Sequence, residues 1–100
     1  ANITVPPNLT DAGLEHLKEL TNLKSLVLDR TQVADGGLVY LQGLANLESI
    51  DLRSTQVTDA GLEHLKGLTG LQKLYLRGTQ VTDSGLEELR AALPDCSIPD

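Results

Sequence analysis

The feature that most constrains the fold of this chain is a segment that returns every 24 residues. The pattern V-x-D-x-G-L begins at Val33, Val57 and Val81, and Leu9 begins a close copy one period earlier. A period of about 20 to 50 residues is typical of repeat architectures, in which each unit needs its neighbours to cover its apolar side. We therefore expect one domain over residues 1–100, made of a partial N-terminal unit (1–8), full repeats (9–32, 33–56 and 57–80) and a C-terminal cap (81–100).

The remainder of each repeat follows the pattern L-x-x-L-x-L-x-x-T-x-V, in which one copy has isoleucine at the second apolar position. Apolar side chains two positions apart, as in Leu26 and Leu28, have the period of a strand and point to one face. Beyond the threonine the spacing lengthens to three, as in Leu62, Leu65 and Leu68, which favours one to two helical turns. Strands that repeat in one direction with a helix between them predict a parallel sheet with right-handed crossovers.

These patterns resemble those of the leucine-rich-repeat family, with threonine where that family carries asparagine or cysteine. The continuation T-D-x-G-L-x-x-L-x-x-L is similar to the cysteine-containing, ribonuclease-inhibitor-like subclass, of the type found in bacterial repeat proteins. The resemblance covers residues 9–93 and implies an α/β fold. That fold is a right-handed solenoid with a parallel β-sheet on its concave face and short helices on its convex face.

Three rows of recurring residues are interpreted as structural. The aspartates precede the predicted helices, where a carboxylate can accept hydrogen bonds from free N–H groups, so we expect helix caps rather than metal ligands. The glycines lie in the first helical turn, where close approach between adjacent repeats would explain them. The threonine hydroxyls are expected to bond the backbone of the turn between units. The rows are Asp11, Asp35, Asp59 and Asp83; Gly13, Gly37, Gly61 and Gly85; and Thr31, Thr55 and Thr79.

Composition argues against several classes of function. The formal net charge of −6 argues against nucleic acid as a partner, because binding to a phosphate backbone needs clustered Lys and Arg. The sequence has neither the run of about 18 apolar residues expected of a membrane-spanning helix nor a signal-peptide pattern, so no membrane partner is predicted. The single cysteine, Cys96, excludes an intramolecular disulfide and is interpreted as a small apolar residue of the C-terminal cap. The cellular compartment stays open.

The two ends of the solenoid are expected to differ. At the C-terminus, residues 94–99 replace the next full strand, and Ile98 is expected to help close the core. At the N-terminus, Ile3 and Val5 would supply a shortened first strand with no helix before it. Two explanations stand for this open edge: the chain is cut from a longer solenoid, which we favour, or a weak homodimer covers the edge of an otherwise monomeric chain.

The outward positions of the strands differ from repeat to repeat and line up as rows across the sheet. They hold five cations and three anions, a net charge of +2, which leaves −8 for the remainder of the chain. A mildly basic face on an acidic body favours an acidic or mixed-charge protein partner. In the alternative interpretation, these charges only neutralise each other across strands, Asp29 with Arg53 and Asp51 with Arg77. The rows are Ser25, Ser49 and Lys73; Val27, Asp51 and Tyr75; and Asp29, Arg53 and Arg77, flanked by Lys24, Glu48 and Gln72 and by Arg30, Ser54 and Gly78.

Tyr75 is the strongest candidate on this face, since it is predicted to lie between two cations, and Tyr and Arg are over-represented among interface hot spots. We hypothesise that Tyr75, Arg53 and Arg77 anchor the partner. Tyr40, by contrast, falls on the helical side and is expected to pack against a neighbouring helix. The full set of candidate partner-binding residues is Tyr75, Arg77, Arg53, Lys73, Asp51, Val27, Asp29 and Arg30.

No catalytic constellation, phosphate-binding loop or dinucleotide fingerprint occurs in the sequence, so no catalytic residue, metal ligand or cofactor is predicted. His16 and His64 lie 48 residues apart on the predicted convex side and are expected to be solvated. The leading interpretation is a non-catalytic protein–protein interaction module that binds a macromolecular partner on its concave sheet. The alternative is a structural or assembly segment of a larger repeat protein, which associates through its ends.

Overall fold

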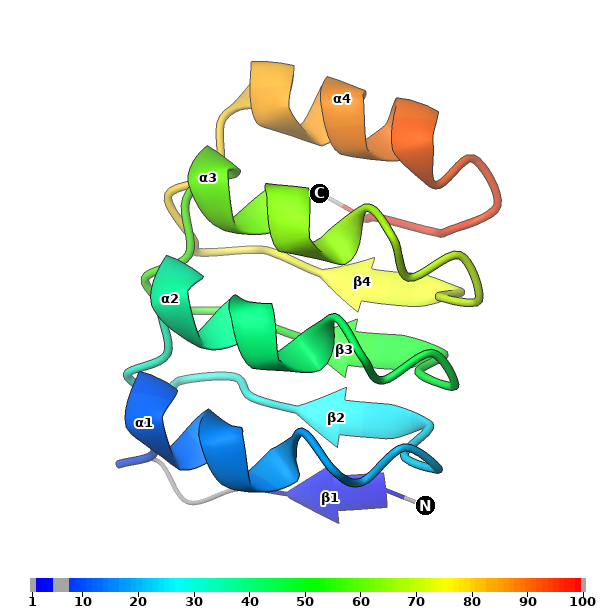
Figure 1. Ribbon diagram of the computed structural model, residues 1–100. Coiled ribbons are helices and arrows are strands. Elements are labelled where there is room, and N and C mark those ends of the chain that lie inside the picture. The colour runs from blue at the N-terminus through cyan, green and yellow to red at the C-terminus, as the bar shows by residue number, and fades with distance from the viewer. Residues whose placement is uncertain (1, 5–7, 100) are drawn as a thin grey trace.

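The computed structural model describes residues 2–4 and 8–99, with side chains from residue 8 onward, as a stack of strand and helix layers (Figure 1). Val5 lies outside the described residues. Each repeat places a three-residue strand on one side and a short helical segment on the other. The elements are β1 (Asn2–Thr4), α1 (Asp11–Leu14), η1 (Glu15–Leu17), β2 (Ser25–Val27), α2 (Asp35–Leu38), η2 (Val39–Leu41), β3 (Ser49–Asp51), α3 (Asp59–Leu62), η3 (Glu63–Leu65), β4 (Lys73–Tyr75) and α4 (Asp83–Ala92), where η marks a 3₁₀ turn.

The four strands form one parallel sheet in the order β1-β2-β3-β4. Leu26 pairs with Ile50 and Ile50 with Leu74, so the 24-residue period of the sequence is the register of the sheet. In β1, Ile3 pairs with Leu26, which makes the first unit one residue shorter than the others. The predicted α/β solenoid, with its sheet on the concave face and helices on the convex face, is confirmed.

The core lies between the sheet and the helices and is built almost entirely of leucine. Leu26, Ile50 and Leu74 point inward from the strands and are fully buried. Leu38 and Leu62 meet them from the helices and are likewise buried. Each such side chain contributes about 1.5–3 kcal/mol when it leaves water, so the inward leucines supply the main drive for stacking.

The aspartates at the starts of α1, α2 and α3 bind the next repeat and not their own helix. Asp35 accepts the backbone N–H of Thr58 at Oδ1 (2.7 Å) and the Thr58 hydroxyl at Oδ2. Asp59 accepts the N–H (2.8 Å) and the hydroxyl (2.5 Å) of Thr82 in the same way. The prediction that these aspartates cap their own helices is wrong, because the residue before each one occupies the N-cap position. Each carboxylate therefore ties one repeat to the next.

The glycines of the first helical turn make room for these carboxylates. A Cβ atom on Gly37 would lie 2.5 Å from Asp11 Oδ1, and a Cβ atom on Gly61 would overlap Asp35 Oδ1. Glycine disfavours a helix by about 1 kcal/mol relative to alanine, so its presence here is explained by the contact between repeats. The predicted close approach is confirmed.

The recurring threonine hydroxyls bond the backbone of the turn as predicted, but each one acts within its own repeat. Thr31, Thr55 and Thr79 donate to the carbonyl three residues earlier, at 2.8, 2.7 and 2.6 Å. Thr31 and Thr55 are buried, and the bond satisfies a hydroxyl that would otherwise be costly to bury. This row therefore shapes the bend after each strand.

The C-terminal segment closes the strand half of the last layer. Ser97 forms a single parallel bridge with Lys73, and its carbonyl accepts the N–H of Leu74 (3.0 Å). Ile98 is buried, and Cys96 packs against the core at intermediate exposure, where burial raises the pKa of its thiol. The predicted contribution of Ile98 and Cys96 to the cap is confirmed.

Candidate functional site

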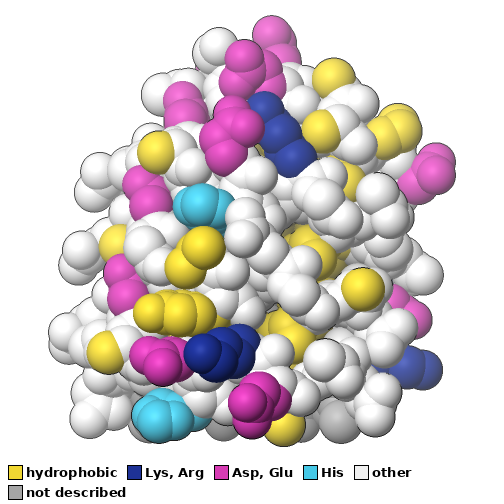
Figure 2. All heavy atoms as spheres, viewed as in Figure 1, with side chains coloured by type: hydrophobic (Ala, Val, Ile, Leu, Met, Phe, Trp, Pro, Cys, Tyr) yellow, Lys and Arg dark blue, Asp and Glu magenta, His cyan; other side chains and the backbone are white. Residues whose placement is uncertain are grey.

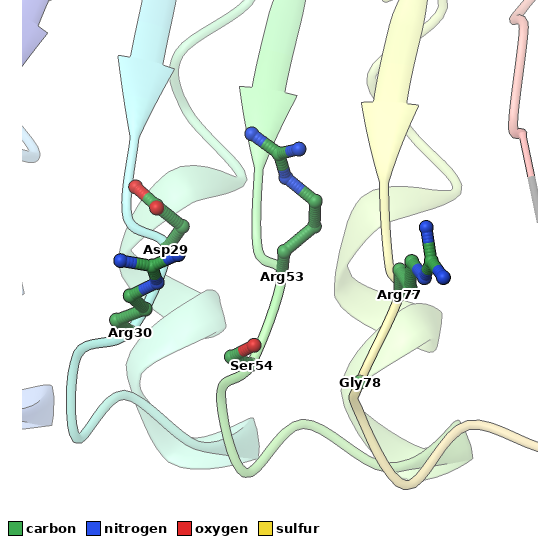
Figure 3. Close-up of a pocket in the computed structure, with 6 residues that line it drawn as sticks. All are labelled: Asp29, Arg30, Arg53, Ser54, Arg77 and Gly78. Atoms are coloured by element: carbon green, nitrogen blue, oxygen red, sulfur yellow. The ribbon is translucent and has the colours of Figure 1, made fainter.

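The outward rows predicted from the sequence are present on the sheet. Val27 pairs with Asp51 and Asp51 with Tyr75, while the row of Ser25 and Ser49 runs on to Lys73. Among the residues that the structure describes, the helices lie behind the sheet and none lies on its outward side (Figure 3). These rows thus face outward on one continuous surface, the open face, which is defined here as the outward strand positions and the bends that follow them.

A fixed cluster of three side chains occupies the middle of the open face. Asp51 accepts two hydrogen bonds from the Arg53 guanidinium, from Nε (2.9 Å) and Nη2 (2.6 Å), and a third from the Arg53 backbone N–H (3.1 Å). The same guanidinium lies over the Tyr75 ring, with 5.3 Å between the Arg53 Cζ atom and the ring centroid. A bidentate ion pair and a cation–π contact together favour this orientation of the Arg53 side chain.

This geometry replaces the predicted pairing across strands. Asp51, the last residue of β3, is bound by Arg53 of the bend that follows this strand rather than by Arg77. Asp51 is also buried, with 7% of its surface exposed, where the sequence predicted an open position. Burial, the largest single influence, would raise the pKa of Asp51, but the hydrogen bonds and charge of Arg53 outweigh it and lower the pKa.

Substituting Arg53→Ala is expected to raise the pKa of Asp51, since burial is then opposed only by the remaining backbone hydrogen bond. In the native chain the lowered pKa contributes stability above the unfolded value of about 3.9, which is lost as the pH falls through the folded value. The stability deficit of Arg53→Ala should therefore be largest at neutral pH and shrink below about pH 4. Urea unfolding of both proteins across this range measures it, and a deficit that does not change with pH would contradict the assignment.

The bends after the strands form a hollow of about 280 Å³ at one end of the open face (Figure 3). Arg30, Ser54 and Gly78 occupy equivalent positions there, with φ of 61°, 58° and 80°. This left-handed conformation suits glycine and is uncommon for other residues. The hollow is lined by Asp29, Arg30, Arg53, Ser54, Arg77 and Gly78.

A second, smaller hollow of about 170 Å³ is lined by Tyr75 together with Arg53, Leu76, Arg77 and Pro99. The structure therefore brings together Arg53, Tyr75 and Arg77, the three predicted anchors. Lys73 is exposed at the start of β4, whereas Arg30 lies in a bend that follows the end of a strand. The two cations are therefore at opposite ends of the strands. Val27 is half-buried in β2, in the same row as Asp51 and Tyr75.

Sequence reasoning placed Ser54 and Gly78 beside the outward rows but not among the binding residues, and it missed Pro99, which lines the smaller hollow. One signal for the bend was available. The triplets 29–31, 53–55 and 77–79 follow the strands and end in threonine, and the last of them has glycine at its middle position. A glycine in one copy of a repeated bend indicates a left-handed backbone in all copies. Pro99 gave no such signal, because its place beside Tyr75 depends on the path of the C-terminal segment.

Figure 2 shows the helical side, with apolar, acidic and histidine side chains at its surface. Tyr40 lies in η2 and packs partly against the core. His64 Nδ1 forms a hydrogen bond with Gln42 Nε2 (2.9 Å), and His16 is exposed. Within residues 2–4 and 8–99, no group of three acidic, histidine or cysteine side chains could hold a metal ion. None of the helices in this described part has the length and hydropathy needed to cross a bilayer.

Comparison with known proteins agrees with this architecture. The family described as "Leucine rich repeat" matches residues 21–81. The chain belongs to the leucine-rich-repeat family. The leucine-rich-repeat fold is generally a protein–protein interaction module, and its members are typically non-enzymatic. No curated protein matches the sequence.

Solved structures show the same leucine-rich-repeat fold at low sequence identity. A chain in the structure of the Chaetomium Mex67:Mtr2 subunits is 18% identical, with a TM-score of 0.72 over 89% of this chain and 68% of that one. An internalin from Listeria monocytogenes is 22% identical, with a TM-score of 0.61 over 87% of this chain and 31% of the internalin. A leucine-rich-repeat protein from Leptospira interrogans is 19% identical, with a TM-score of 0.62 over 97% of this chain and 28% of that protein. The chain spans less than a third of the last two.

Proposed function

We propose that this leucine-rich-repeat chain binds a protein partner on its open face, through an anchor made of Arg53, Tyr75 and Arg77. The observation that carries the proposal is the cluster of Asp51, Arg53 and Tyr75, which fixes a cation and an aromatic ring on an uncovered sheet. A side chain that is already held in place loses little conformational entropy on binding, so more of its contact energy remains as affinity.

Charge supports a partner with an acidic or mixed-charge surface. Arg53 is neutralised locally by Asp51, whereas Arg30 and Arg77 make no ion pair within the described residues. These two arginines line the larger hollow from its two ends, with Asp29 as its acidic member. Carboxylates of a partner can approach Arg77 or Arg30, and a basic group can approach Asp29. We therefore propose that Asp29, Arg30, Val27 and Lys73 form the surrounding contacts.

Replacing Tyr75→Ala together with Arg77→Ala is expected to weaken partner binding by at least about 30-fold, since one hot-spot residue contributes about 2 kcal/mol or more. Affinity capture with the native chain identifies the partner, and titration calorimetry then gives the dissociation constants. The matched control is Val39→Ala with Glu87→Ala, two exposed residues of the helical side. Equal loss in both double variants, or loss in neither, would remove the open face as the binding site.

A second candidate function is association through the N-terminal edge of the solenoid. The observation that favours it is the position of β1, which pairs with β2 on one side and with no described strand on the other. An uncovered strand edge is a ready template for another chain. Sedimentation equilibrium is expected to show a concentration-dependent dimer if this edge associates, and a monomer at all concentrations would eliminate this candidate.

A further inference from the structure

The bends that follow β2, β3 and β4 share a backbone conformation that suits glycine, but only one of them has glycine. Arg30, Ser54 and Gly78 stand at the same position of three successive repeats, with φ of 61°, 58° and 80°. This left-handed region is uncommon for residues other than glycine, asparagine and aspartate, because the Cβ atom crowds the backbone. Arginine and serine therefore occupy places where glycine would be the more stable choice.

The backbone hydrogen bonds of these bends do not require a side chain. The N–H groups of Arg30 and Ser54 donate to the carbonyls of Arg53 and Arg77 in the next repeat, both at 2.9 Å. A glycine at either position could donate the same bond without strain. Backbone strain that the fold does not require is concentrated at binding sites in proteins. Stability therefore does not explain the side chains of Arg30 and Ser54, and both of them line the larger hollow of the open face.

This hollow lies across three successive repeats of the stack. None of its lining residues comes from β1 or from residues 94–99. Ser54 lies between the Arg30 and Gly78 walls (Figure 3), and a Cβ atom on Gly78 would crowd the Ser54 hydroxyl oxygen at 3.1 Å. Because Gly78 has no side chain, the hydroxyl stays open to the hollow. The hollow thus offers a hydrogen-bond donor between two walls that carry arginine.

The three arginines of the hollow differ in the partners that they already have. Arg53 donates from Nε and Nη2 to Asp51, and Figure 3 shows its guanidinium pointing back along β3. Arg30 and Arg77 are exposed and make no ion pair within the described residues. These two guanidinium groups are therefore the cations that an incoming anion can pair with.

The local charge decides which anion fits. Asp51 raises the pKa of Arg53 through its hydrogen bonds, and Asp29 adds a smaller electrostatic contribution, so both carboxylates act on the site. Three arginines and two aspartates give this site a net charge of +1. A carboxylate neutralises that charge, whereas a phosphate group carries about −1.5 to −2 at pH 7 and would leave excess negative charge beside the two aspartates.

We propose that the hollow receives the carboxylate of one aspartate or glutamate side chain of the protein partner, held by Arg30, Ser54 and Arg77. The carboxylate accepts the hydrogen bond of the Ser54 hydroxyl, and the guanidinium groups of Arg30 and Arg77 donate to it from the two walls. Hydrogen bonds between such charged groups are short and strong. The proposal rests on the proposed function, since the hollow belongs to the open face, and it assigns a specific ligand group to Arg30 and Ser54, which lie outside the anchor.

The ligand class is tested with the full chain and a blocked tripeptide, acetyl-Ala-Glu-Ala-amide, followed by amide chemical shifts in an NMR titration. Saturable shifts are expected at Arg30 and Ser54 with a dissociation constant of about 1 mM, the affinity that two charge-assisted hydrogen bonds give. The same peptide with glutamine should bind at least about tenfold more weakly, because it lacks the charge. The peptide with phosphoserine should bind no more tightly than the glutamate peptide. Shifts that do not saturate by about 10 mM, or tighter binding of phosphoserine, would overturn the proposal.

The variant Arg30→Gly separates binding from stability, because the two are expected to change in opposite directions. Loss of the guanidinium should weaken binding of the glutamate peptide at least about fivefold. Relief of the left-handed conformation should raise the midpoint of thermal unfolding by about 2–6 °C. Arg30→Lys keeps the charge and should retain most of the affinity. The control Lys18→Gln removes an exposed cation of the helical side and should leave peptide binding unchanged.

The results for peptide and partner distinguish this proposal from the proposed function. Native affinity of Arg30→Gly for the glutamate peptide, or a lower unfolding midpoint, would overturn the assignment of Arg30. If the Tyr75 and Arg77 double variant loses the partner while Arg30→Gly binds it with native affinity, the hollow is not used and only the proposed function stands. Native partner affinity in both variants would instead overturn the proposed function, and with it the role of the hollow in partner binding.

Discussion

Ile50→Ala is expected to destabilise the protein by about 4 kcal/mol, against about 2 kcal/mol for Ile98→Ala. The two substitutions remove the same atoms, but the positions differ. Ile50 is fully buried and lies in register between Leu26 and Leu74. Ile98 is 6% exposed in the last layer, where no further strand covers it among the described residues.

The physical reason is that each layer of a solenoid contacts only its neighbours. A cavity at Ile50 weakens the contact on both of its sides and cannot be filled by movement of a chain end. At Ile98 the C-terminal segment can shift and collapse part of the cavity, which lowers its cost. Because a domain of this size has a total stability of about 5–15 kcal/mol, the central variant loses a large share of it.

Chemical denaturation of both variants beside the native chain measures the difference. Leu20→Ala serves as a control, since this side chain is 42% exposed and should change stability by less than about 0.5 kcal/mol. Equal losses of stability in Ile50→Ala and Ile98→Ala would contradict this explanation. It requires a residue with a neighbouring layer on both sides to contribute more than a residue of the last described layer.

The layered fold was predictable from the sequence because one period governs it. The spacing of 24 residues sets the register of β2, β3 and β4, and the apolar period of two sets which side chains face the core. Both signals are local and repeated, so an error at one position is corrected by the others. The repeat period does not, however, predict which hydrogen-bond or ion-pair partner a polar side chain has in the folded protein.

The bonds between repeats show this limit. Asp35 and Thr58 are 23 residues apart, and the sequence offered a nearer role for the carboxylate at the start of its own helix. One signal pointed the other way: Thr10, Thr58 and Thr82 precede three of the aspartates, and threonine is itself a preferred N-cap residue. In α3 the Thr58 hydroxyl accepts the N–H of Ala60, so Asp59 is free to bind Thr82 of the next repeat.

The candidate site was predicted in place but not in detail. The rows on the open face followed from the strand period, and Tyr75 lies beside Arg53 as the register requires. The pairing of Asp51 with Arg53 was missed because only neighbours across strands were considered. The long Arg53 side chain reaches back from the bend to the end of β3, so the choice between the two pairings depends on rotamers that a sequence does not encode.

Gly61→Ala is expected to destabilise the protein by about 1–3 kcal/mol, although alanine is the better helix former by about 1 kcal/mol. The added Cβ would overlap Asp35 Oδ1, which is held by the N–H and hydroxyl of Thr58. Relief of the overlap requires the carboxylate to move and these bonds to lengthen. Thermal unfolding should show a midpoint lower by about 4–8 °C per kcal/mol.

The matched control is Gly67→Ala, since a Cβ atom at Gly67 has no heavy atom within 4 Å and should leave stability almost unchanged. A double-mutant cycle then isolates the cause. Asp35→Ala removes the atom that the new methyl group meets, so Gly61→Ala should cost little in that background, and the two changes should be strongly non-additive. If the costs simply add, the glycine is retained for its backbone and not for the carboxylate. A non-additive cycle would establish that the helix gives up its own stability at Gly61 to bind the preceding repeat.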